Sequence, residues 1–182
     1  MKKLLLNSKE NFMLMAMALC LVGCLGVPEG AQPVKGFKLD SYLGKWYEIA
    51  RLDHSFERGL SNVTAEYSLR EDGGVRVINR GFKSDRNKWK DAEGKAYFVG
   101  DTSTGQLKVS FFGPFYGAYN VIALDQEAYQ WSLVVGPDTS YLWILSRTPV
   151  LDQAIVDQLV SEAKSLGFST DELIFVNQDQ NQ

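Results

Sequence analysis

The chain has 182 residues, of which 45% are hydrophobic and 12% aromatic, so it can bury one domain-sized core. Its formal net charge of -3 and isoelectric point near 5.2 exclude the basic surface that nucleic-acid binding requires. We therefore expect a single domain with no nucleic-acid partner.

The first 23 residues differ in composition from the rest of the chain. Lys2, Lys3 and Lys9 precede an apolar run over residues 12–23, which is the arrangement of a basic n-region and a short h-region in a secretory signal. Spanning a bilayer takes about 20 apolar residues, so this run is too short for a transmembrane helix. We interpret residues 1–23 as a signal peptide that is removed from the mature protein.

The signal segment ends in Leu-Val-Gly-Cys at residues 21–24, which resembles the lipobox of bacterial lipoproteins. The resemblance implies cleavage before Cys24 and lipidation of its thiol and new amino group, so that several acyl chains anchor the protein. The other cysteine, Cys20, lies in the removed segment, and the mature protein would contain no disulfide. Because Leu25 rather than aspartate follows, the resemblance to Gram-negative lipoproteins implies sorting to the outer membrane. The anchored domain faces either the periplasm, which we favour, or the cell exterior.

Residues 24–36 form the next segment, and their composition is typical of a linker. The glycines and prolines are Gly26, Pro28, Gly30, Pro33 and Gly36. We expect this segment to tether the domain near the membrane without fixing its orientation. The folded domain is predicted to span residues 37–182 and to begin with a short turn over residues 37–43.

From residue 46 to residue 147 the chain alternates between strand-like runs and turn signals, at the spacing of a β-sandwich or β-barrel. Asp72-Gly73 is a strong two-residue hairpin signal, and no long helical pattern interrupts the strands. Eight strands are predicted, over residues 46–53, 62–71, 74–83, 88–99, 105–112, 117–125, 129–135 and 140–147.

After Pro149 the hydrophobic period changes from that of a strand to that of a helix. The apolar positions at helical spacing are Ile155, Leu159, Ala163 and Leu166. Asp152 lies near the start of this run and Gly167 just past its end, where helix caps are expected. We predict one amphipathic helix packed outside the sheet, then a short strand over residues 173–176 and a frayed tail.

Three residues mark the two ends of this strand series. Gly44 and Trp46 open the first strand within Gly-Lys-Trp-Tyr-Glu-Ile-Ala-Arg, and Arg147 ends the eighth. These features resemble the first and third signatures of the lipocalins, in particular their bacterial branch, although Asp125 alone remains of the middle signature. The resemblance implies an all-β fold: an eight-stranded antiparallel up-and-down lipocalin β-barrel with one C-terminal amphipathic helix packed outside. It also assigns Gly44, Trp46 and Arg147 to barrel closure, through a cation–π contact worth roughly 1 kcal/mol.

An eight-stranded barrel has an interior just wide enough for side chains or one small ligand, and alternate residues of each strand face it. If Arg147 faces inward at the closed end, Trp143 and Tyr141 face inward nearer the mouth. The candidate ligand-binding residues are Trp143, Tyr141, Tyr67, Asn79, Val77, Leu107, Val109 and Phe111. Two interpretations stay open: these side chains line a site for a hydrophobic ligand, as the resemblance implies, or they fill the barrel as core.

The predicted topology places four loops at the mouth, over residues 53–61, 84–87, 113–117 and 136–139. The stretch at 111–116 is unusually aromatic for a loop, and it either meets a membrane, a partner subunit or a ligand tail, or folds back on the barrel. Four cations lie in or beside these loops, namely Arg58, Lys83, Arg86 and Lys88. They either meet an anionic headgroup or are solvated surface charges.

These features favour a non-enzymatic lipid carrier. The resemblance to bacterial lipocalins implies that it stores or transports fatty acids or lysophospholipids for membrane maintenance. An enzyme is disfavoured, because His54 is the only histidine and the only mature cysteine is lipidated, so no Cys/His pair or multi-histidine zinc site can form within one chain. We expect no catalytic residue, cofactor or metal.

Two further hypotheses about function remain open besides the lipid carrier, namely an enzyme and a structural or interaction lipoprotein. Glu48 and Glu57 could support carboxylate acid–base chemistry, but nothing in the sequence pairs them, and His54 is expected to be an ordinary loop residue. A structural or interaction lipoprotein would have a filled barrel that binds no small molecule. Its aromatic mouth would then form the contact of a homodimer.

Overall fold

The computed structural model describes residues 25–181; the predicted signal peptide and Cys24 lie outside them. The strands are β1 (Gly44–Arg51), β2 (Leu60–Leu69), β3 (Val75–Lys83), β4 (Lys88–Phe98), β5 (Gln106–Phe112), β6 (Phe115–Leu124), β7 (Trp131–Val135), β8 (Leu142–Ser146) and β9 (Ile174–Phe175). The helices are α2 (Leu39–Tyr42) and α3 (Gln153–Ser165), with 3₁₀ turns at Ser84–Arg86, Thr170–Glu172 and Asp179–Asn181. Within residues 25–181, no helix is long and apolar enough to cross a membrane.

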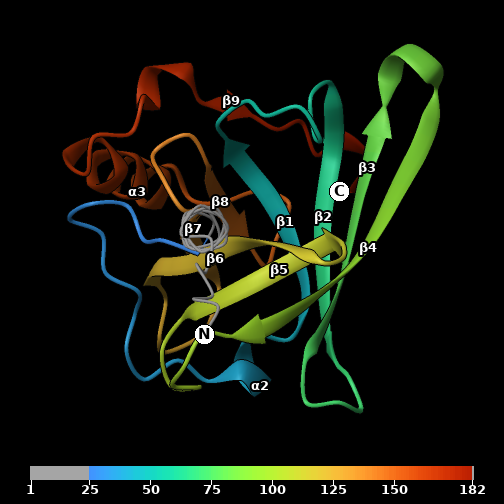
Figure 1. Ribbon diagram of the computed structural model, residues 1–182. Coiled ribbons are helices and arrows are strands. Elements are labelled where there is room, and N and C mark those ends of the chain that lie inside the picture. The colour runs from blue at the N-terminus through green and yellow to red at the C-terminus, as the bar shows by residue number, and fades with distance from the viewer. Residues whose placement is uncertain (1–24, 182) are drawn as a thin grey trace, which may run out of the picture.

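The sheet closes on itself, because β1 pairs with β2 on one side and with β8 on the other. Each strand from β1 to β8 is antiparallel to the next, and β9 adds to β1 outside the ring. Figure 1 shows α2 at one end of this barrel and the tip of the β3–β4 hairpin projecting at the opposite end. The predicted up-and-down barrel with eight strands is therefore confirmed.

At the closed end, Trp46 is fully buried and its indole Nε1 donates to the carbonyl of Tyr42 over 2.8 Å. The Arg147 guanidinium lies 3.9 Å from the centre of the Trp46 ring and donates to the carbonyls of Ser41, Lys45 and Tyr129. Gly44 has a φ of +92°, and a Cβ there would lie 3.4 Å from Arg147 Nη1. The structure thus brings together the three residues assigned to barrel closure.

Helix α3 covers the outside of the barrel, as the helical period predicts. Its N-cap Asp152 accepts a hydrogen bond from the Ala154 N–H at 2.8 Å. The helix buries Val156, Leu159 and Ala163 toward the barrel wall. A second core cluster is formed by α3 with outward-facing wall residues such as Ala50, Leu133 and Ile144.

Residues 25–36 do not form the loose tether that their composition predicts. Ala31 is 4% exposed, the Val34 N–H donates to the Val121 carbonyl, and Asn120 Nδ2 donates to the Gly26 carbonyl at 3.0 Å. An isolated bridge joins Lys35 to Thr104. Glycine and proline predict the turns of this segment, but its few apolar side chains are enough to lay it on the barrel.

Candidate functional site

The inner wall of the barrel is one apolar cluster that starts at Trp46 and continues toward the mouth. Six of the eight candidate ligand-binding residues belong to it. Tyr67, Val77 and Leu107 are buried members, and Val109, Phe111 and Trp143 are half-buried residues packed against them. Gly94 of β4 makes room for Phe111, because a Cβ at Gly94 would lie 2.8 Å from the Phe111 ring.

Three phenols fill the base of this interior. The Tyr119 hydroxyl is 2.8 Å from that of Tyr42 and 2.9 Å from that of Tyr67, and Tyr42 also contacts Ser132 Oγ at 3.2 Å. Burial raises the pKa of Tyr42 to about 12 and also raises the pKa values of Tyr67 and Tyr119. The base is therefore a neutral, hydrogen-bonded plug, and Tyr67 is part of it.

Above the plug, the inward face of the wall is not fully covered by other side chains. Ala65, Val109 and Trp143 pack against the inner cluster yet remain half-buried rather than buried. Asn79 lies opposite Ala65 in the β2–β3 pairing and shares the face of Val77, and it too is half-buried. These residues of the upper half of the barrel therefore keep partial solvent exposure, in contrast to the buried phenols at its base.

Aromatic rings gather on the mouth side of Trp143. Tyr141 lies near it, with ring centres 6.1 Å apart, and His54 approaches to 5.2 Å. His54 in turn stacks on Phe56 at 3.9 Å. His54 lies in the loop between β1 and β2, as expected, but this loop folds over the wall and leaves the histidine only 6% exposed.

A buried charged cluster lies beneath the same loop. Arg51 is 1% exposed, and its Nη1 is 2.6 Å from Glu48 Oε1, while its Nη2 donates to the backbone carbonyls of Glu57 and Leu60. The Glu57 carboxylate accepts from Trp143 Nε1 at 3.0 Å and lies 2.9 Å from His54 Nε2. One guanidinium and one carboxylate thus hold the loop against β1 and β8.

The sequence did not indicate that Glu48 or Glu57 contacts another functional side chain. The structure corrects this, because both carboxyl groups lie in the buried charged cluster. The reason is a register shift in β1 between Glu48 and Ala50, where the pairing with β8 skips one residue. Such a bulge breaks strict alternation. As a result Glu48 and Arg51 contact each other, although regular alternation would put them on opposite faces of the strand.

The two carboxyl groups differ in their electrostatics. Burial, together with the nearby Glu57, raises the pKa of Glu48 well above its ordinary value. Burial also acts to raise the pKa of Glu57, but the contacts with His54, Trp143 and Arg51 outweigh it and hold that pKa below its ordinary value. Glu57 is therefore the more readily ionised of the two carboxyl groups, while Glu48 is the one whose carboxyl group contacts the Arg51 guanidinium.

This arrangement predicts how stability depends on pH. Because the folded-state pKa of Glu57 lies below its ordinary value of 4.5, its stabilising contribution is complete above pH 4.5 and is lost as the pH falls further. Glu57→Gln removes the titrating group, so the free energy of unfolding should fall less steeply as the pH decreases. We expect urea unfolding below pH 4.5 to show a smaller drop in the free energy of unfolding for Glu57→Gln than for the wild type. Equal drops would contradict the role given to Glu57.

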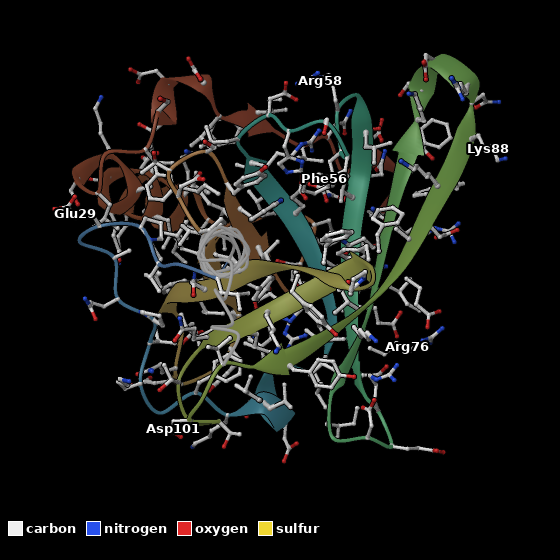
Figure 2. All side chains as sticks on the ribbon, viewed as in Figure 1. Glu29, Phe56, Arg58, Arg76, Lys88 and Asp101 are labelled. Atoms are coloured by element: carbon white, nitrogen blue, oxygen red, sulfur yellow. The ribbon has the colours of Figure 1, made fainter. Side chains whose placement is uncertain are left out.

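The open end of the barrel carries the four predicted mouth loops. Figure 2 shows Phe56, Arg58 and Lys88 toward this end and Asp101 at the opposite end. Arg58 forms an exposed ion pair with Asp53 at 2.7 Å, and Lys83 lies 3.8 Å from Asp85. Among residues 25–181, no group of three or more His, Cys, Asp or Glu side chains could hold a metal ion.

Comparisons with known proteins agree with the architecture. The family model described as "Lipocalin-like domain" matches residues 37–178. The outer membrane lipoprotein Blc of Vibrio cholerae is 59% identical over 158 residues, covering 87% of this chain and 92% of that protein. The Escherichia coli K12 protein of the same name is 56% identical over 151 residues, covering 83% of this chain and 85% of that protein.

More distant proteins share the fold. The temperature-induced lipocalin-1 of Arabidopsis thaliana is 34% identical over 149 residues, covering 77% of this chain and 78% of that protein. Among solved structures, insecticyanin from the tobacco hornworm Manduca sexta superposes with a TM-score of 0.67 at 22% identity, covering 84% of this chain and 86% of that chain.

Proposed function

The chain belongs to the lipocalin family, and from this premise we propose that it stores or transports amphiphilic lipids for membrane maintenance. Like its Blc relatives, it is a lipid-anchored lipoprotein of the outer membrane. Fatty acids and lysophospholipids are the ligands that fit the proposal, with one acyl chain in the barrel and the polar head at the mouth. Lipidation of Cys24 supplies the anchor, and the domain faces the periplasm.

The observation that carries the proposal is the contrast between the two halves of the interior. The base is closed by the Tyr42, Tyr67 and Tyr119 plug, whereas Val109 and Trp143 higher on the wall are apolar, inward-facing and half-buried. Burying a methylene group contributes about 0.8 kcal/mol, so a chain of a dozen methylenes gains roughly 10 kcal/mol before the costs of association. Micromolar affinity is compatible with that balance.

We assign the ligand contacts by height in the barrel. The acyl chain lies against Val109 and Phe111, with Asn79 as one amide in an apolar wall, and its end reaches Val77 and Leu107 beside the plug residues Tyr67 and Tyr119. The headgroup lies beside Trp143 and Tyr141 at the mouth. The lipocalins are generally binding proteins, and the contacts of Glu48 and Glu57 with Arg51, His54 and Trp143 support a structural role for these carboxyl groups.

A binding titration tests this assignment. We expect lysophospholipids and fatty acids to bind saturably when intrinsic tryptophan fluorescence is followed, and Trp143→Ala to weaken binding about tenfold, which corresponds to roughly 1.4 kcal/mol. Trp89→Ala is the matched control, because Trp89 lies on the β3–β4 hairpin and belongs to neither core cluster. It should leave the affinity unchanged.

Absence of binding by any of these amphiphiles, with the fold intact by circular dichroism, would refute the carrier. The barrel would then be filled, and the interaction lipoprotein would take its place. Equal weakening by Trp143→Ala and Trp89→Ala would place the ligand outside the barrel mouth.

A further inference from the structure

Two aromatic side chains at the tip of the β5–β6 hairpin are left in water. Phe112 is 82% exposed and Phe115 is 77% exposed, and they face each other across the turn formed by Gly113 and Pro114. On the loop between β1 and β2, which also lies at the open end, Phe56 is 49% exposed. Exposed phenylalanines that gather on one end of a protein mark a contact surface rather than core.

The β3–β4 hairpin at the same end is strongly basic. It pairs along its whole length to Lys83 and Lys88, and it extends beyond β5, which pairs with β4 only over residues 95–98 (Figure 1). A hollow of about 400 Å³ at its tip is lined by Lys83, Arg86, Lys88, Trp89, Lys90 and Asp91. This concentration of cations contrasts with the net charge of -3 for the whole chain.

The cations of the tip are only partly neutralised. Asp91 lies 3.6 Å from Arg80 and Asp85 lies 3.8 Å from Lys83, but Arg86, Lys88 and Lys90 form no ion pair with any residue of the described part of the chain. Lysines commonly protect a free strand edge, which β4 has near Lys88. That role does not explain an arginine in the turn, nor the exposed phenylalanines on the next hairpin.

The N-terminal segment approaches the barrel from this end as well. The Gly26 carbonyl accepts from Asn120 Nδ2, which also donates to the Gly136 carbonyl in the loop between β7 and β8. A Cβ at Gly26 would lie 3.3 Å from the Pro137 carbonyl in the same mouth loop. Cys24, the proposed site of acylation, is two positions before Gly26 in the chain. A lipid anchor there would bring the membrane close to the mouth.

We propose that the open end of the barrel is a docking surface for the phospholipid leaflet. Phe112 and Phe115 enter the boundary between headgroups and acyl chains, and Arg86, Lys88 and Lys90 bind lipid phosphates. Aromatic rings and cations are the side chains that favour this zone. Docking sets the mouth against the membrane, so that an amphiphile can pass between leaflet and barrel without crossing bulk water.

Vesicle binding by residues 25–182 tests the surface without the acyl anchor. These residues contain every strand and both core clusters, so this chain keeps the barrel complete. Vesicles of phosphatidylethanolamine with phosphatidylglycerol provide anionic phosphates, and vesicles of phosphatidylcholine alone serve for comparison. We expect preferential co-sedimentation with the anionic vesicles, and a loss of about tenfold in partitioning for Phe112→Ser/Phe115→Ser and for Arg86→Gln/Lys88→Gln/Lys90→Gln.

Matched controls lie at the closed end. Leu69 is 57% exposed where β2 ends, and Lys38 is exposed beside α2, so Leu69→Ser and Lys38→Gln remove the same kinds of side chain from the opposite end. Both controls should partition like the wild type. Absence of wild-type binding, or equal loss in the controls, would overturn the proposal. So would loss of self-association instead of vesicle binding in the phenylalanine variant, because the tip would then be an interface between copies.

The full lipidated chain gives an independent readout. A nitroxide spin label attached at Gly113→Cys reports on the β5–β6 tip and leaves both phenylalanines in place. The same label attached at Leu69→Cys reports on the closed end. We expect the Gly113 label to be reached by oxygen dissolved in the bilayer and shielded from a water-soluble nickel complex, with the reverse at Leu69. Equal aqueous exposure of both labels would overturn docking. Lysophospholipid titration of the docking variants separates the two proposals, because failure of the carrier would abolish ligand binding and leave vesicle binding in place.

Discussion

Replacing Arg51 with methionine is expected to destabilise the barrel by about 3–5 kcal/mol, because breaking a buried ion pair leaves an uncompensated charge. The Arg51 guanidinium is the buried cation between Glu48 and the loop that carries Glu57, and it also satisfies the carbonyls of Glu57 and Leu60. In Arg51→Met these carbonyls lose their donor and the two carboxyl groups lose their counter-charge. Urea unfolding measures the loss.

Two further variants separate charge from packing. Arg58→Met removes an exposed ion pair with Asp53 and should leave the free energy of unfolding nearly unchanged. Arg51→Met/Glu48→Gln should recover part of the loss, since one of the facing carboxyl groups no longer ionises. A cost for Arg51→Met no larger than that for Arg58→Met would show that the charged cluster does not hold the loop.

Trp46→Ala is expected to cost about 3–5 kcal/mol by leaving a large cavity at the closed end. Trp46 is fully buried, packs against the Tyr42 ring at 4.7 Å and supports the Arg147 guanidinium. Its loss also leaves the Tyr42 carbonyl without its indole donor. Chemical unfolding followed by circular dichroism measures the effect without relying on tryptophan fluorescence.

Trp46→Phe and Trp89→Ala calibrate that prediction. Phenylalanine refills part of the space and keeps an aromatic face for Arg147, so we expect Trp46→Phe to cost less than half as much as Trp46→Ala. Trp89→Ala removes a tryptophan outside both core clusters, and its cost should stay near 1 kcal/mol or below. If Trp46→Ala proved no more damaging than Trp89→Ala, the Trp46–Arg147 contact would not close the barrel.

The strands were predictable because turn chemistry and alternation act locally. The strand predicted over residues 105–112 is β5 (Gln106–Phe112), and the helix expected after Asp152 is α3 (Gln153–Ser165). Asp125 is the one residue of the middle lipocalin signature that this chain retains. Its carboxylate accepts hydrogen bonds from the backbone N–H groups of Glu127, Ala128 and Gln130, which explains why an aspartate suits that loop.

The contacts that the sequence did not reveal depend on events that are not local. Burial of His54 depends on where its loop comes to rest, and the pairing of Glu48 with Arg51 depends on one bulge in β1. Alternation assumes that no residue is skipped, so a single bulge changes which charges meet. In the same way, Ala31 and Val34 show that packing on a finished barrel can order a segment rich in glycine and proline.

Native mass spectrometry with lysophosphatidylethanolamine tests whether one acyl chain occupies the upper interior of the barrel. We predict a complex of one lipid per protein for the wild type. Val109→Trp, which puts a much larger side chain on the inner face of β5, should lose that complex while keeping a cooperative unfolding transition. Absence of the complex in the wild type, or its persistence in Val109→Trp, would contradict the claim and place the lipid outside the barrel.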